Sequence, residues 1–142
     1  MGRAILAAVT AVLAGQMTVA VSTHGHDARD VRYALTFRYD MQCGYPGKDP
    51  AVVTFPGRVP LRIARPAVLV DGAPARDVTV RGRAVTVAMP PRPLVMCASI
   101  GPGRLTIVFT PRAGIANPTV PGRYTVRVVK GTQTFAAPVA VR

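Results

Sequence analysis

The side chains that most often carry catalysis are few in this chain of 142 residues. Its only histidines are His24 and His26, and its only serines are Ser22 and Ser99. A Ser–His–Asp arrangement would need Ser99 positioned against a polar N-terminal segment, which general-base geometry does not favour. The sequence therefore gives no support for nucleophilic catalysis by serine.

Paired carboxylates are the other common catalytic arrangement, and the chain contains six Asp and no Glu. The candidates in its body are Asp40, Asp49, Asp71 and Asp77. Asp71 precedes a glycine in a turn and Asp77 opens a strand-like run, so solvated turn positions explain both better than glycoside hydrolysis does. We expect a protein that is not an enzyme.

The segment His24-Gly25-His26-Asp27 is the one cluster of possible metal ligands. Imidazoles suit copper, nickel or zinc, and a chain that began at Ser22 would have a histidine in the third position, where Cu(II) can bind. The body offers no further ligands, so a closed zinc site is not supported. His24 and His26 are weak metal candidates; the simpler interpretation is a solvated tail, and no cofactor is expected.

Cys43 and Cys97 are the only cysteines. In an exported protein such a pair predicts a disulfide, and closing a loop of this length stabilises a fold by about 4 kcal/mol. The alternative, a reactive thiol, would need a nearby base, and none is evident.

The N-terminus is typical of an exported protein. Arg3 is followed by an apolar run from Ala4 to Leu13 and then by small residues. These features predict a signal peptide over residues 1–22, cleaved after Ala20 or after Ser22. A retained membrane anchor is the alternative, but Gly15-Gln16 interrupts the only apolar window long enough to span a bilayer.

Removal of this leader gives a secreted, extracellular chain with no membrane span. We expect a flexible lead-in over residues 23–30, because that stretch is polar and has no periodicity. Residues 31–142 are long enough for a single domain with its own core.

The body alternates apolar and polar residues with a period of two, most clearly from Val31 to Tyr39. Turn residues separate about eight such runs, and no long helical period appears. The pattern predicts an all-β antiparallel sandwich of two sheets, with a closed barrel as the alternative. Pro138 suggests that the last strand is an edge strand. The predicted strands cover 31–39, 51–55, 67–70, 77–80, 83–89, 104–109, 123–129 and 134–141.

The net charge is +12, from 18 Lys and Arg against six acids. Such a charge attracts polyanions in general. The basic residues are scattered and aromatic residues are few, which argues against nucleic acid. The charge is either compositional or functional; in the second case the outward side chains of the predicted strands would carry it, namely Arg32, Arg38, Arg104, Arg123 and Arg127.

Seven stretches between residues 51 and 130 occur in an order and spacing typical of a known module: 52–56, 59–60 with Ile63, 68–72, 78–80 with 85–87, 105–109, 114–119 and 121–126. Together they resemble a bacterial surface module with an immunoglobulin-like fold, of the kind found in S-layer and other cell-surface proteins. They also resemble stand-alone secreted proteins of actinobacterial type. The resemblance implies a spacer, adhesive or structural element without catalytic residues.

We therefore expect a non-enzymatic binding or structural module at the cell exterior whose loops carry recognition. The best candidate loops are 40–50 and 111–122, with Tyr45 and Arg112 as the residues most typical of interfaces. The partner would be a cell-envelope protein. The alternative is a cationic protein that binds an anionic wall polymer or lipid through the outward arginines.

Overall fold

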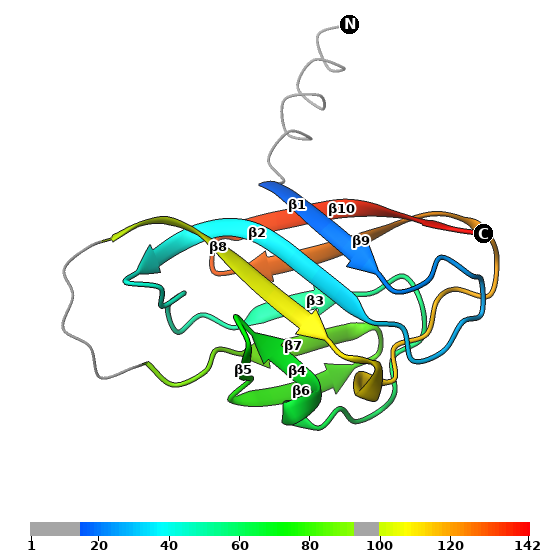
Figure 1. The fold of residues 1–142 in the computed structure, drawn as a ribbon, viewed down its shortest axis with the longest axis horizontal. Helices are drawn as coiled ribbons and strands as arrows, with labels where there is room; N and C mark the ends of the chain where they lie inside the picture. The colour runs from blue at the N-terminus through cyan, green and yellow to red at the C-terminus, as the bar shows by residue number, and fades with distance from the viewer. Residues whose placement is uncertain (1–14, 93–99) are drawn as a thin grey trace, which may run out of the picture.

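The structure is a computed structural model of the chain and describes residues 15–92 and 100–142. The predicted all-β class is confirmed, and among the described residues no helix is long and apolar enough to cross a membrane (Figure 1). In chain order the elements are β1 (Gly15–Val21), β2 (Tyr33–Gln42), β3 (Ala51–Thr54), the 3-10 turn η2 (Arg65–Ala67), β4 (Val68–Val70), β5 (Ala73–Pro74), β6 (Asp77–Arg81), β7 (Ala84–Ala88), β8 (Ile100–Phe109), the 3-10 turn η3 (Pro111–Ala113), β9 (Gly122–Lys130) and β10 (Gln133–Val141).

The described strands form one continuous sheet of ten, in the order β5-β4-β8-β2-β1-β10-β9-β3-β7-β6. Neighbouring strands are antiparallel, except that β1 and β10 run parallel. The sheet curls over like half a barrel (Figure 1). The predicted division into two separate sheets is not clear in this arrangement, because β1 connects the two halves.

Strand β2 shows how the period-two pattern builds the core. Tyr33, Leu35 and Phe37 are almost fully buried, whereas Arg38 on the opposite face is exposed. Successive side chains of a strand point to opposite faces, so one face of β2 packs inside the curled sheet and the other faces outward.

Aromatic side chains join the two halves of the sheet across the core. Phe55, directly after β3, makes edge-to-face contacts with Tyr33 of β2 and Phe109 of β8, with ring centroids 5.1 and 4.8 Å apart. The ring centroids of Phe37 in β2 and Phe135 in β10 are 4.4 Å apart. Such ring pairs contribute about 0.5–1.5 kcal/mol each beyond the area they bury.

Strand β1 lies in the middle of the sheet. Residues 17–21 pair with β2, and residues 15–16 pair with β10. Met17 is buried, and a Cβ atom added to Gly15 would stand 2.8 Å from the Phe135 ring. Strand β1 thus lies within the predicted leader, residues 1–22. The leader and its cleavage stay predictions, and residues 1–14 lie outside the described residues.

Residues 23–30 have no regular strand, but their backbone is hydrogen bonded to the body. The Arg142 N–H donates to the His24 carbonyl, and the His26 N–H donates to the Arg142 carbonyl, both at 2.8 Å. The buried amide of Asn117 donates to the Thr23 and Gly25 carbonyls at 3.1 and 2.9 Å. The segment runs beside the end of β10, and the flexible lead-in that its polarity predicts stays a prediction.

The predicted edge position of the last strand is wrong, because β10 lies between β1 and β9. Strand β1 pairs with β10 only at Phe135 and Ala136, so Pro138 lies beyond that pairing. Proline is tolerated there since the ladder with β1 needs no N–H from residue 138.

Two tight turns have backbone geometry that favours glycine. Asp71-Gly72, predicted as a turn, joins β4 and β5 with φ values of 48° and 85°. Cys43-Gly44 has φ values of 51° and 82° and follows β2. Consecutive positive φ angles are typical of the two-residue turns of hairpins. Cys97 lies outside the described residues, so its predicted bridge to Cys43 stays a prediction.

Candidate functional site

Two arginines face each other on the outer side of the sheet. Strands β2 and β8 pair so that Arg38 lies directly opposite Arg104, and both side chains are exposed. Opposite residues of an antiparallel pair have Cβ atoms about 4.5–5.5 Å apart, and like charges at this separation destabilise the sheet. Both arginines are exposed as expected, but their pairing depends on the strand register.

Arg38 and Arg104 line an open hollow, called here the outer hollow, with a volume of about 960 Å³, and Met17, Phe37 and Phe135 form its apolar part. Strands β1, β2, β8 and β10 form it, and no acidic residue of the described chain lines it. The hydroxyls of Thr36 and Thr106 are hydrogen bonded at 3.3 Å. The neutral polar side chains of the lining are Gln16, Thr18, Thr36 and Thr106.

Further arginines extend the positive charge beyond the outer hollow, towards β9. Gln16 pairs with Ala136 of β10, and Ala136 pairs with Arg127 of β9. Three strand steps of about 4.8 Å separate β2 from β9, so the arginines of these two strands are roughly 14 Å apart measured along the curled sheet. We call Arg104, Arg38 and Arg127 the arginine row. Arg123 lies on the same face of β9, four residues earlier.

The chemistry available at this surface is anion binding. A guanidinium presents its N–H donors as a planar fork that matches a carboxylate or phosphate. Threonine hydroxyls and the Gln16 amide add neutral hydrogen-bonding groups of the kind that sugars and polyols need. No His, Cys, Asp or Glu of the described residues lines the outer hollow, so its lining offers binding groups without a general base.

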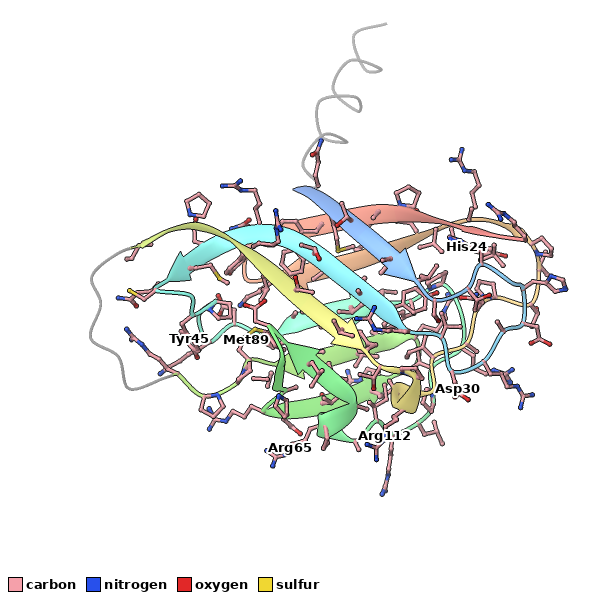
Figure 2. All side chains as sticks on the ribbon, in the orientation of Figure 1. His24, Asp30, Tyr45, Arg65, Met89 and Arg112 are labelled. Atoms are coloured by element: carbon pink, nitrogen blue, oxygen red, sulfur yellow. The ribbon has the colours of Figure 1, made fainter. Side chains whose placement is uncertain are left out.

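The two loops that the sequence favours for recognition follow opposite ends of the β2–β8 ladder, and Figure 2 shows Tyr45 on the left and Arg112 at the bottom, right of centre. Tyr45 follows the end of β2, whereas Arg112 belongs to η3, after β8. Strands β2 and β8 are antiparallel and span about 30 Å, so loops 40–50 and 111–122 cannot contribute to one site. Each loop would have to bind a partner separately.

Local surroundings also separate Tyr45 and Arg32 from the arginine row. The Arg92 guanidinium carbon lies 6.0 Å from the centre of the Tyr45 ring. Arg32 comes just before β2, at the opposite end of that strand from residue 42, and its N–H donates to the Ser22 hydroxyl at 2.9 Å. Its exposed side chain therefore lies away from the outer hollow.

The two histidines are exposed, and the structure places a backbone carbonyl against each ring. His24 Nδ1 is 2.8 Å from the Ala140 carbonyl, and His26 Nδ1 is 2.6 Å from the Arg142 carbonyl. These hydrogen bonds require Nδ1–H on both rings. Within residues 15–92 and 100–142, no three His, Cys, Asp or Glu side chains are grouped as metal ligands. Metal binding by His24 and His26 stays an untested, weak prediction.

Lys130 is a buried cation that the sequence analysis did not single out. Its ammonium donates to the Asp49 carbonyl at 2.5 Å and lies 4.5 Å from the centre of the Tyr39 ring. Burial lowers the pKa of Lys130, and the Asp49 carboxylate opposes this effect. The alternation of β9 carries the signal, because Val126, Val128 and Lys130 all occupy its inward face.

A second surface feature lies in the loops at one end of the sheet. Leu61 and Val120 are 92% and 64% exposed, and both line one open hollow. We call these two side chains the apolar tip. Arg58 and Arg83 line the same hollow, and the Arg83 guanidinium donates to the Pro56 carbonyl at 3.2 Å.

Comparison with known proteins finds a similarity in fold and none in sequence. No protein-family model matches the chain, and no curated protein sequence matches it. Among solved structures, it is similar to BslA, described as a bacterial hydrophobin, with a TM-score of 0.54 at 14% sequence identity. The match covers 91% of this chain and 98% of the BslA chain. At this identity the likeness concerns the all-β fold alone.

Proposed function

We propose that this chain is an exported, non-catalytic binding module of the cell exterior, and that its ligand is an anionic envelope polymer. The polymer would bind along the arginine row and the outer hollow. The pairing of Arg38 with Arg104 carries the proposal, because it places two like charges opposite each other without an acid in the hollow. An anionic ligand would relieve the repulsion that the pairing creates.

The same proposal includes export of the chain and an immunoglobulin-like arrangement of its strands in two sheets. The apolar run from Ala4 to Leu13 supports export. Apart from β1, the strand order consists of β5-β4-β8-β2 and β10-β9-β3-β7-β6, which face each other through the Phe55 and Phe37 contacts. This facing of two groups of strands is the observation that supports an immunoglobulin-like two-sheet arrangement.

The test is binding of the purified protein to immobilised polyglycerol phosphate and polygalacturonate, with neutral dextran as the reference. We expect binding to both anionic polymers and none to dextran, and we expect it to weaken as NaCl is raised. The variant Arg38→Gln/Arg104→Gln should bind about tenfold more weakly, because two exposed charge contacts of about 0.7 kcal/mol each sum to about 1.4 kcal/mol.

The matched control is Arg76→Gln/Arg81→Gln, which removes the same charge near β6 at the far edge of the sheet. Both of these arginines are exposed, so their replacement leaves the core unchanged. The control should bind almost as well as the parent protein. An equal loss in both variants would show that net charge alone drives binding, and the proposed site would be wrong.

A second candidate function is action at an apolar interface. The exposure of the apolar tip favours it, and the fold likeness to a protein described as a bacterial hydrophobin supports it. Drop tensiometry tests it with Leu61→Gln. The matched control is Ile100→Gln, which changes a 71% exposed side chain at the start of β8, away from the apolar tip. Equal surface activity of the parent protein and both variants would exclude a role for the apolar tip.

A further inference from the structure

We propose that the leader is cleaved between Ala14 and Gly15, so that the mature chain begins with β1. The inference rests on the export included in the proposed function. It replaces the two cleavage positions that residue types alone suggest, after Ala20 and after Ser22, by one position before β1. Strand β1 carries the argument. The part played by residues 1–14 is read from their sequence only.

Cleavage after Ala20 or Ser22 would remove a central strand. Residues 17–21 of β1 pair with β2, and residues 15–16 pair with β10. Without β1, β2 would lose its partner along one edge, and the two halves of the sheet would lose the strand that connects them. An unpaired strand edge exposes N–H and C=O groups that template aggregation, a liability for a free exported protein.

The packing of β1 shows that it belongs to the domain. Met17 is 8% exposed and is part of the hydrophobic core, with Val19 and Val21 packed against that core. Gly15 lies against the Phe135 ring with no room for a Cβ atom. A chain that began at Thr23 would therefore lose apolar contacts as well as strand pairing.

The sequence before Gly15 has two features of a processing site, in a leader of 14 residues that is just shorter than the usual range of about 15–30. Ala14 supplies a small residue directly before the cut. The apolar run 4–13 has ten residues, within the usual span of about 7–15 for the hydrophobic region of a signal peptide. Cleavage there also keeps Gln16 and Thr18, which line the outer hollow.

The decisive measurement is the N-terminus of the exported protein. The full chain is expressed in a bacterial host with a general export pathway, and material outside the cytoplasm is analysed by intact mass and N-terminal sequencing. A chain beginning at Gly15 supports the proposal. A chain beginning at Val21 or Thr23, or one that retains Met1, overturns it.

Two substitutions give a second test of the cleavage position, in addition to the N-terminus of the parent chain. Ala14→Arg should block processing and leave the precursor in the cell fraction. Ala20→Arg should leave processing unchanged. It would disrupt both alternative sites, because Ala20 is the last residue before a cut after Ala20 and the third residue before a cut after Ser22. Ala20 is exposed on β1, so the change spares the core. Blocked processing in Ala20→Arg alone would overturn the proposal.

These outcomes are separate from those of the polymer-binding test. The position of the N-terminus is measured without any ligand, and polymer binding is measured on protein whose N-terminus is known. A chain that begins at Gly15 and binds no polymer would keep the processing site and refute the proposed ligand. A chain that begins at Thr23 and binds polymer would do the reverse.

Discussion

Replacing Arg104 by threonine should stabilise the fold, an unusual outcome for a substitution at a candidate binding site. Arg104 lies opposite Arg38 on the outer face, where the two positive charges repel. Two unit charges about 6 Å apart interact with about 0.7 kcal/mol in water, and salt at 0.15 M screens roughly half of that. Threonine also suits an exposed strand position. We expect the free energy of unfolding to rise by about 0.3–0.7 kcal/mol at low salt.

The assay is a double-mutant cycle followed by urea unfolding. Arg38→Thr, Arg104→Thr and the double variant are measured at 10 mM and 500 mM NaCl, chosen as low and high ionic strength. Each single substitution should stabilise at low salt, the second should add less than the first, and the difference should disappear at high salt. Arg81→Thr is the control, because Arg81 pairs with uncharged Ala84. Loss of stability in both single variants, or a coupling that high salt leaves unchanged, would refute the repulsion on which the site is based.

Three further outcomes are expected. Burial raises the pKa of Tyr33 from 10.0 to about 12, so the folded state favours the neutral phenol; stability should fall by about 2–3 kcal/mol as the pH rises from 10 through 12, and Tyr33→Phe should abolish that loss in urea unfolding. Burial lowers the pKa of Lys130, so the folded state binds its proton less tightly than the unfolded state does; stability should rise with pH as it approaches 10.5, and Lys130→Met should remove this slope. A chain starting at Thr23 should have a free energy of unfolding in urea lower than that of a chain starting at Gly15, by at least the roughly 1.5–3 kcal/mol that burial of Met17 contributes; equal free energies of unfolding would contradict the structural role of β1.

The strand pattern of the body was predictable because alternation directly reports which face is buried. Strand β9 matches its predicted range to within one residue at each end, strand β2 begins two residues and ends three residues later than predicted, and the Asp71-Gly72 turn was predicted from its residue types. Strand β1 was missed for a physical reason. Met17, Val19 and Val21 alternate with polar or small residues as in any half-buried strand, but the stretch directly follows an apolar run that is typical of a leader.

The candidate site was only partly predictable. Residue types and alternation indicated that Arg38 and Arg104 point outward, since both lie opposite the core face of their strands. Their juxtaposition depends on the register between two strands in which the paired arginines are more than sixty residues apart in sequence, and no local pattern encodes that register. The buried position of Lys130 was available from the alternation of β9, whereas the burial of Asn117 depends on the path of residues 23–25.

The parallel pairing of β1 with β10 has a mechanical consequence. Residue 15 lies beside Phe135, and the chain then runs in the same direction as β10 until His24 and His26 meet Arg142. A tensile force applied between residues 15 and 142 would therefore load these neighbouring segments in shear, with their hydrogen bonds resisting together instead of opening one at a time. A module with this geometry would resist load applied along its length.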